Sequence, residues 1–267
     1  MVEVAALYVY PVKSCAGIRC ERATLDGRGL QHDRGWMVVD GHDEFVTQRE
    51  HPRLALITPQ LDADMLRLTT PEGQTVAVPS SGVAGPTRQI RIWRDWCEAI
   101  DQGGSAAQFF SDWLGESVRL VKMAGDYERQ VNPGYTQTPA ITGFSDGFPL
   151  LLISEASLDD LNFRLDTPLP MNRFRPNLVV KGCDRFAEDG WQQLNIGTIT
   201  FHVAKPCDRC VVTTTDQATG ARGVEPLRTL ATYRRAGTQV YFGQNIVHRS
   251  VGNIAVGESV EVVPRAR

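Results

Sequence analysis

Apolar residues recur at short intervals along the first hundred residues, in the pattern of β-strands. Five apolar segments are separated by turn-forming Asp, Gly or Pro: 4–12, 35–40, 54–60, 65–70 and 75–79. Between residues 88 and 101, Ile90 and Ile92 alternate with polar or charged side chains. Short strands at close spacing, with turn residues between them, are typical of an all-β unit. We therefore expect a small β-rich module up to about residue 100.

Helical spacing appears only after this module. The pattern predicts three helices: 106–114, 154–165 and 225–235. Ser105 and Ser154 are placed to cap the first two helices, and Gly115 is placed to end the first. Pro226 falls in the first turn of the third, where proline is tolerated. The polar stretch 124–147 has no clear period and predicts a long loop, a feature that is often functional in compact proteins.

The remaining apolar segments predict strands, including the β-branched run that follows two close cysteines. They are 118–123, 148–153, 177–182, 196–204, 210–216, 240–249 and 258–264. Strands therefore dominate both halves of the chain, with a few helices at the edges. This pattern predicts a mainly β protein, a β-barrel with a few peripheral helices packed on an N-terminal β-barrel-like module. No Pro/Ser linker separates the two halves, so we expect them to pack tightly.

Composition narrows the class of protein. The 267 residues are 42% apolar and 22% charged, with a net charge of −3, so nothing predicts a nucleic-acid partner. Arginines alternate with acidic residues, which indicates a mixed, solvated surface. No apolar run approaches the roughly 20 residues of a membrane helix, and the start lacks the pattern of a signal peptide. We expect a cytoplasmic protein without a membrane partner.

Cys207 and Cys210 form a C-x-x-C pair in a chain with six cysteines. Such a pair is half of a zinc site, a redox dithiol, a metal thiolate beside a bystander, or two buried thiols. Zinc would need further ligands, for which Cys15 and Cys20 are candidates. A redox dithiol is expected at a helix N-terminus, whereas the following β-branched run predicts a strand. The charged neighbours Lys205, Asp208 and Arg209 indicate a ligand-facing turn and would favour thiolate.

Three further segments place cations at predicted strand ends. Lys13 and Ser14 follow the first strand, and Arg34 precedes the second. Another strand is preceded by a segment that carries polar side chains: Arg173, Arg175 and Asn177. Each segment alone is a typical surface feature, and together they would suit an anion such as a phosphate.

These segments, taken in order, resemble the MOSC-domain family, the proteins similar to the C-terminal part of molybdenum cofactor sulfurase. The resemblance rests on eight motifs across the chain: YPVKS, DR.WMVVD, TQREHPRLALI, SDGFPLLLISEASLDDLN, FRPNLVV.G, KPCDRCVVTTTD..TG, EPLRTLATYR and FGQN. It implies an N-terminal MOSC-associated β-barrel module over 1–110 and a MOSC domain over 111–267. It also implies a molybdenum cofactor of the molybdopterin type and the reduction of N-hydroxylated compounds.

The resemblance assigns roles to individual residues. Cys210 would ligate molybdenum, Cys207 would be a nearby thiol that is not required, and Asp208 and Arg209 would lie beside the metal as catalytic residues. Pterin and phosphate binding would fall to eight residues: Lys13, Ser14, Arg34, Asp146, Gly147, Phe148, Arg175 and Asn177. A soft thiolate suits such a metal centre. The loop 124–147 would then flank the substrate entrance.

Two departures from the family pattern matter. Asp208 stands where these relatives often have Ser, and the chain ends at Arg267 without the ferredoxin domain of the bacterial relative. Electrons would then come from a separate ferredoxin- or flavoprotein-type partner, unless the chain is a fragment. The implied substrates are hydroxylamines, amidoximes or N-hydroxylated bases. The alternatives are a sulfur carrier or cofactor-handling protein without reductase activity and, more remotely, a zinc-stabilised structural protein.

Overall fold

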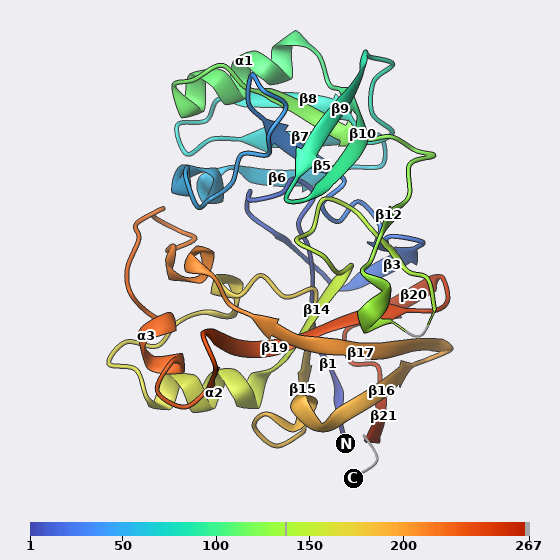
Figure 1. Ribbon diagram of the computed structural model, residues 1–267, viewed down its shortest axis with the longest axis vertical. Helices are drawn as coiled ribbons and strands as arrows, with labels where there is room; N and C mark the ends of the chain where they lie inside the picture. The colour runs from blue at the N-terminus through green and yellow to red at the C-terminus, as the bar shows by residue number, and fades with distance from the viewer. Residues whose placement is uncertain (137, 265–267) are drawn as a thin grey trace.

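The computed structural model describes residues 1–136 and 138–264, and most of its regular structure is β-strand. Figure 1 shows an upper part with α1 and strands β5 to β10, and a lower part with the largest sheet, α2 and α3. Both termini lie at the lower end. The predicted mainly β class, with few helices, is confirmed.

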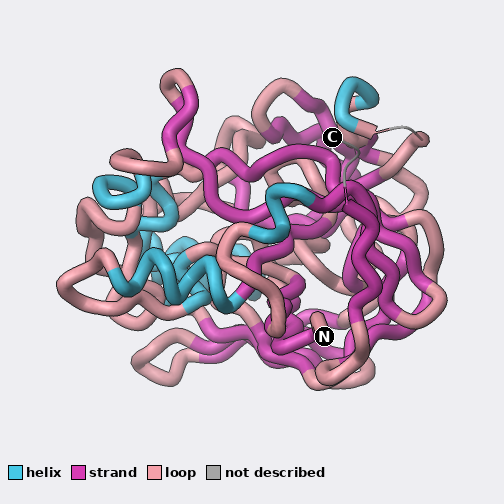
Figure 2. The backbone as a smooth tube through the Cα atoms, turned by 90° about the horizontal axis from the view of Figure 1, so that it is seen from below, coloured by secondary structure: helices cyan, strands magenta, loops and turns pink. Residues whose placement is uncertain are grey.

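The largest sheet in the described part of the chain has nine strands in the order β2-β1-β15-β14-β19-β17-β16-β21, with β18 paired to β19. Their bounds are β1 Glu3–Val9, β2 Ile18–Cys20, β14 Leu150–Ser154, β15 Leu178–Lys181, β16 Trp191–Ile196, β17 Ile199–Asp208, β18 Arg235–Ala236, β19 Gln239–His248 and β21 Val260–Pro264. Only β14 and β15 pair in parallel within it. Seen from below in Figure 2, these strands bend around a core, and most of the helical segments gather on one side.

Four smaller sheets complete the structure over the described residues. The upper part holds β5 Trp36–Val39, β9 Thr87–Ile92, β10 Asp95–Asp101 and β11 Arg119–Met123 in one sheet, and β6 Thr58–Leu61, β7 Met65–Thr69 and β8 Thr75–Pro79 in another. The side of the molecule holds β3 Arg22–Asp26, β4 Gly29–Leu30 and β20 Gly252–Ala255, together with the pair β12 Arg129–Gln130 and β13 Ile141–Thr142.

Strand β5 is apolar at every position and β14 at every position except its last, Ser154, and both faces of each strand are buried. Trp36 and Val38 of β5 pack in one core cluster with α1 and β7, while Met37 and Val39 pack in a second cluster with β9 and β10. Strand β14 likewise divides its leucines and isoleucine between two clusters of the lower part. A continuous short apolar run is the pattern of such strands, so these predictions are confirmed.

The helices agree in part with the prediction. Their bounds are α1 Gly104–Leu114, α2 Glu155–Phe163 and α3 Leu227–Leu230, with short 3₁₀ helices at Pro52–Leu56, Pro133–Tyr135, Met171–Arg173, Ala187–Gly190 and Val211–Thr214. Ser154 caps α2 by accepting from the Ser157 N–H, and Gly115 ends α1 in the left-handed region. Ser105 does not cap α1, because the helix already begins at Gly104. The third helix is shorter than predicted.

The strand predicted at 210–216 is wrong. Strand β17 ends at Asp208, and Val211–Thr214 form the 3₁₀ helix η5. The hydroxyls of Thr213 and Thr214 donate to carbonyls three residues back, at 2.9 and 2.8 Å. Such local side-chain bonds compete with strand pairing and override the β-propensity of the run. The strand therefore cannot serve as an argument against a redox dithiol.

The two halves of the chain share sheets. Strand β1 pairs with β15, and β3 pairs with β20 near the C-terminus. The predicted tight packing is thus observed, and a domain boundary at residue 110 stays a prediction. The expected loop at 124–147 contains β12, β13 and the 3₁₀ helix Pro133–Tyr135, and Gln137 within it lies outside the described residues.

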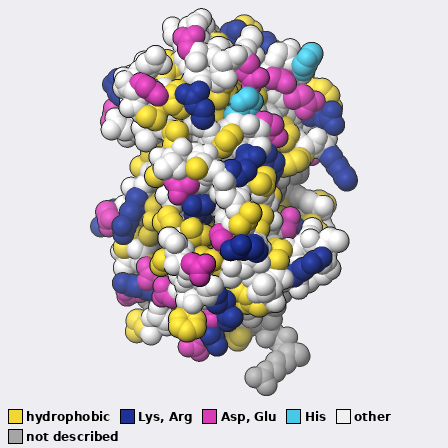
Figure 3. All heavy atoms as spheres, turned by 90° about the vertical axis from the view of Figure 1, so that its left-hand side faces the viewer, with side chains coloured by type: hydrophobic (Ala, Val, Ile, Leu, Met, Phe, Trp, Pro, Cys, Tyr) yellow, Lys and Arg dark blue, Asp and Glu magenta, His cyan; other side chains and the backbone are white. Residues whose placement is uncertain are grey.

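The surface is mixed in character. On the face shown in Figure 3, basic, acidic and hydrophobic side chains are interspersed, as the sequence predicts. Among the described residues, no helix is long and apolar enough to cross a membrane.

Candidate functional site

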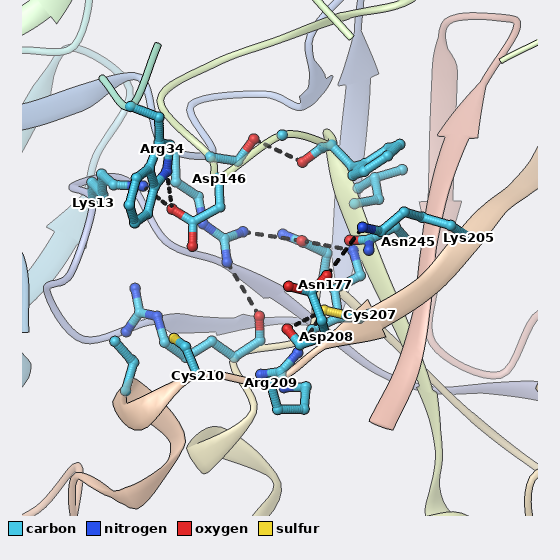
Figure 4. A pocket seen from close by; sticks show the side chains of 18 of the residues that line it. Lys13, Arg34, Asp146, Asn177, Lys205, Cys207, Asp208, Arg209, Cys210 and Asn245 are labelled. Carbon is cyan, nitrogen blue, oxygen red and sulfur yellow. Dashed lines mark hydrogen bonds and ion pairs between the residues drawn. The ribbon is translucent and has the colours of Figure 1, made fainter. Parts of the chain in front are cut away.

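A cavity of about 690 Å³ opens where segments from both halves of the chain meet. All eleven residues that the sequence assigned to the site line it: Lys13, Ser14, Arg34, Asp146, Gly147, Phe148, Arg175, Asn177, Asp208, Arg209 and Cys210. Figure 4 shows most of them pointing toward a common space. Arg173, from the same segment as Arg175, lies elsewhere and donates to the Thr214 carbonyl and the Asp216 carboxylate.

One wall of the cavity is basic, and we call Lys13, Ser14, Arg34 and Arg175 the anion pole. Lys13 and Ser14 follow β1, Arg34 precedes β5, and Arg175 precedes β15. Arg34 donates to the Asp33 carboxylate at 2.5 Å and to the Asn177 side-chain oxygen at 3.0 Å. These contacts fix the Arg34 guanidinium and also place Asn177 at the cavity wall.

Arg175 is a buried cation without a matching anion. Its Nη1 donates to the Cys15 carbonyl at 2.6 Å, while its Nη2 has no hydrogen-bond partner. No salt bridge within the described residues pairs it with a carboxylate, and it is only 9% exposed. Burial, aided by the charge of Arg34, lowers the pKa of Arg175 to about 10. An unsatisfied buried guanidinium is costly, and Arg175 lines the cavity, so an anionic ligand bound there would compensate its charge.

Asp146 links the two halves across the cavity. Its carboxylate pairs with Lys13 at 2.6 Å and Arg49 at 3.2 Å, and it accepts from the Trp93 indole at 3.3 Å. Enclosure in the site would raise the pKa of Asp146, but the charges of Lys13 and Arg49 outweigh it and lower that pKa. Burial lowers the pKa of Lys13 to about 8, although Asp146 opposes the shift. Asp146 is therefore ionised at neutral pH, with its side chain 57% exposed to the cavity.

The two cysteines have different surroundings. Cys210 lies 3.4 Å from Arg49 Nη2, whereas Cys207 lies 2.9 Å from Arg209 Nη1 and packs against the cluster around Phe174. Burial raises the pKa of the Cys207 thiol, despite Arg209. Arg209 does favour the Cys207 thiolate, as expected of a nearby cation, but burial outweighs it. Both thiols are half-buried and line the cavity, and they differ in the arginine that reaches each sulfur: Arg49 at Cys210 and Arg209 at Cys207.

The mouth of the cavity combines an ion pair with aromatic rings. Lys205 pairs with Asp208 at 3.0 Å and lies 5.1 Å from the Tyr135 ring centroid, and Tyr135 meets Phe148 edge to face. Burial would lower the pKa of Lys205, but its hydrogen bond to Asp208 raises it overall. Tyr135 belongs to the segment 124–147, so this segment does border the cavity.

Backbone strain is concentrated at this site. Four non-glycine residues that line the cavity have a positive φ: Ser14 (71°), Arg34 (47°), Trp93 (56°) and Arg175 (55°). Such conformations are disfavoured for residues with a side chain and persist where the surrounding structure enforces them, often at binding sites.

The sequence analysis missed several cavity residues, of which Arg49 is central. Arg49 contacts Asp146 and Cys210, and its guanidinium carbon lies 4.6 Å from the Trp93 ring centroid. Arg129, also missed, is buried and donates to the Gly143 and Ser145 carbonyls, which supports the turn before Asp146. Arg49 lies within one of the eight motifs, but a single arginine among charged neighbours looks like a surface residue.

The described residues contain no group of three or more His, Cys, Asp or Glu side chains that could hold a metal ion. Zinc shared between the two cysteine pairs therefore lacks a ligand set in this part of the chain. A metal held by one thiolate and an additional ligand molecule needs no such group.

Comparison with known proteins places the chain in a family. Residues 1–117 match the MOSC N-terminal beta barrel domain, and residues 140–261 match the MOSC domain. The chain is 35% identical to the mitochondrial amidoxime-reducing component 1 of Homo sapiens over 276 residues, which cover 96% of this chain and 82% of that protein. The chain belongs to the MOSC-domain family. The resemblance stated from the motifs is thus confirmed.

Other relatives are similar to the chain to the same extent. Identity is 36% with component 1 of Mus musculus and 34% with component 2 of Homo sapiens, with the same 96% of this chain covered and 81% and 82% of those proteins. Lys13, Arg34 and Arg49 lie in the MOSC N-terminal part, whereas Arg175, Cys207 and Cys210 lie in the MOSC domain itself. The cavity is therefore built by both parts together.

Proposed function

We propose that this chain binds a molybdenum cofactor of the pterin type in the cavity and reduces N-hydroxylated compounds. The observation that carries the proposal is that a thiol, Cys210, and an unsatisfied buried guanidinium, Arg175, line the same cavity. A thiolate and a phosphate-binding pole are the two features that such a cofactor requires. The names of the relatives, amidoxime-reducing components, support the reaction class.

The residues that line the cavity fit a molybdenum cofactor of the pterin type. The anion pole would hold its phosphate, with Arg34, Arg175 and the Lys13 ammonium as its positive charges. Asn177 would orient Arg34 at the same wall through the hydrogen bond it already accepts. Gly147 and Phe148, which follow Asp146, would line the pterin side. Cys210 would hold the metal, and Arg49 would lie against its sulfur as a positive charge.

The reaction needs protons at the mouth of the cavity. Reduction of a hydroxylamine, R–NHOH + 2e⁻ + 2H⁺ → R–NH₂ + H₂O, consumes two electrons and two protons. The bound cofactor would supply the oxygen-atom and electron chemistry. The Lys205–Asp208 pair lies at the mouth and holds a protonated ammonium beside a carboxylate that is 46% exposed. We assign to this pair the delivery of protons, and to Arg209 the fixing of Cys207 and of the Phe174 carbonyl.

The electrons would come from a separate protein of the ferredoxin or flavoprotein type. A chemical reductant can replace that partner in an assay, so the reductase activity is testable without it.

The test is turnover of benzamidoxime by protein made in a host that synthesises the cofactor, with reduced methyl viologen as the electron source. We expect turnover by the wild type, a loss of at least about a hundredfold for Cys210→Ser, and most of the activity in Cys207→Ser. Equal loss in both variants would indicate a dithiol mechanism. A wild type that carries cofactor but does not turn over would favour a cofactor-handling role, and a persulfide on either cysteine would favour sulfur transfer.

A further inference from the structure

Behind the anion pole, the Tyr10 ring contacts two guanidinium groups. The Arg34 and Arg175 guanidinium carbons each lie 4.3 Å from the ring centroid. Tyr10 is 1% exposed and is not among the described residues that line the cavity, so the ring lies behind the arginines. No role follows for Tyr10 from the sequence or from the proposed chemistry.

The ring compensates for charge that the protein leaves unpaired. Two guanidiniums that contact the same ring repel each other, and the charge of Arg34 contributes to the lowered pKa of Arg175. Arg34 has the Asp33 carboxylate, but Arg175 has no carboxylate in a salt bridge within the described residues. The face of an aromatic ring is negative and attracts a cation most strongly where water is excluded. Both guanidiniums contact the same ring, so one ring can stabilise both cations.

The ring is fixed by backbone contacts on each side. The Tyr10 N–H donates to Asp33 Oδ1 at 2.8 Å, and the Tyr10 carbonyl accepts from the Arg34 N–H at 2.8 Å. Gly17 closes the space at the ring edge, because a Cβ placed there would lie 2.4 Å from Tyr10 Cε1. These contacts restrict the position of the ring, and the ring in turn restricts the two guanidiniums that contact it.

The phenol hydroxyl takes no part in these contacts. Tyr10 Oη is buried and has no hydrogen-bond partner. Removing it should therefore cost little, since a buried hydroxyl without a partner contributes no favourable bond. The geometry makes the ring, and not the hydroxyl, the functional feature.

We propose that Tyr10 is a positioning residue that holds Arg34 and Arg175 in the orientation in which they bind an anionic group. The proposal rests on the proposed function, in which that group is the phosphate of the cofactor. It predicts that the affinity of the site for an anion falls when the aromatic ring is removed or displaced.

Matched variants separate the ring from the hydroxyl. Tyr10→Phe keeps the ring, Tyr10→Leu replaces it with a smaller aliphatic side chain, and Gly17→Ala displaces it from outside the cavity. Each purified protein is titrated with sulfate, and its molybdenum and pterin contents are measured after expression in a cofactor-producing host. We expect Tyr10→Phe to bind sulfate within about twofold of the wild type, and Tyr10→Leu to bind about tenfold more weakly and lose cofactor. Gly17→Ala should fall between them.

The outcomes are distinct. Wild-type protein with neither sulfate binding nor cofactor would contradict the proposed function itself. Wild-type binding with unchanged binding by a folded Tyr10→Leu would leave that function intact and overturn the role of Tyr10. A loss in Tyr10→Phe as large as in Tyr10→Leu would also overturn it, because the hydroxyl would then be the active group. If Tyr10→Leu does not fold, Gly17→Ala decides, and unchanged sulfate affinity in that variant would contradict the proposal.

Discussion

At the scale of single residues, the site is short of negative charge. Lys13 and Arg175 are both buried, and burial lowers the pKa of each, to about 8 and about 10. Asp146 is shared between Lys13 and Arg49. The protein thus stabilises these cations only in part, which is the state expected of a site that is completed by an anionic ligand.

The depressed pKa of Lys13 predicts how anion binding depends on pH. A bound anion favours the protonated ammonium, so affinity is fully present below pH 8 and is lost as pH rises through the pKa of the free protein. Sulfate keeps its two charges throughout this range, which makes it a suitable probe. Its affinity should fall by up to about tenfold per pH unit above pH 8, as measured by calorimetric titration from pH 6 to 10.

Lys13→Arg is the control for this titration. An arginine at position 13 stays protonated well above pH 8, so the variant's curve should be flat between pH 8 and 9, below the pKa of about 10 at Arg175. A wild-type affinity that does not change above pH 8, or a variant that loses affinity in parallel with the wild type, would exclude Lys13 as the titrating group.

The residues of the site were predictable where the chain places a cation at a strand end. Lys13, Arg34 and Arg175 could be found in this way, since strand ends meet at the rim of a barrel. Arg49 could not, because its partners Asp146 and Cys210 are distant in sequence and its neighbours are charged. The family resemblance assigned different roles to Cys207 and Cys210, but their different surroundings could not be predicted, because they depend on which arginine reaches each sulfur.

At the scale of elements, the loop after η5 holds Arg49 in place. Arg222 Nη2 donates to the Gln48 and Arg49 carbonyls at 2.6 and 2.8 Å. Gln217 and Gln48 exchange hydrogen bonds between their side-chain amides at 3.1 and 3.2 Å. Asp216 stiffens the loop by accepting from two backbone N–H groups within it. The loop after the cysteines thereby clamps the segment that carries Arg49.

Arg222→Gln should release this clamp. Two hydrogen bonds from a charged group would be lost, so the free energy of unfolding should fall by about 1.5–3 kcal/mol, and less molybdenum should be retained as Arg49 moves. Thermal or urea unfolding and metal analysis measure the two effects.

The matched control is Arg228→Gln, because Arg228 is 68% exposed and contacts only Glu225 and solvent among the interactions described. It should change neither quantity appreciably, as is usual for surface ion pairs. Equal effects of the two substitutions, or no effect of Arg222→Gln, would contradict the clamp.

Elements with a strong period or a long apolar run were predictable, and those governed by local side-chain bonds were not. The runs in β5 and β14 and the Ser154 cap follow from patterns that burial and capping enforce. The segment 211–214 has strand propensity, yet its threonine hydroxyls fold it into η5. Helix α3 covers only four residues of the predicted eleven, because its apolar positions are too few to bury a longer face.

At the scale of the whole molecule, the two matched parts are interlocked. Strand β1 contributes Val4, Leu7 and Val9 to the core of the lower part, although it lies in the MOSC N-terminal part. Such pairing between distant segments cannot be read from local periodicity, so the sequence suggested two modules in succession. The cavity lies where the two matched parts meet, and residues of both parts line it.

The most direct measurement is the cofactor content of the whole protein. The chain is expressed with added molybdate in a host that makes the cofactor, as wild type, Cys210→Ser and Cys207→Ser. Molybdenum is measured by mass spectrometry, and pterin by fluorescence after oxidation. We predict about one molybdenum and one pterin per chain for the wild type and for Cys207→Ser, with molybdenum lost from Cys210→Ser. Zinc in place of molybdenum, or neither metal nor pterin in the wild type, would contradict the account.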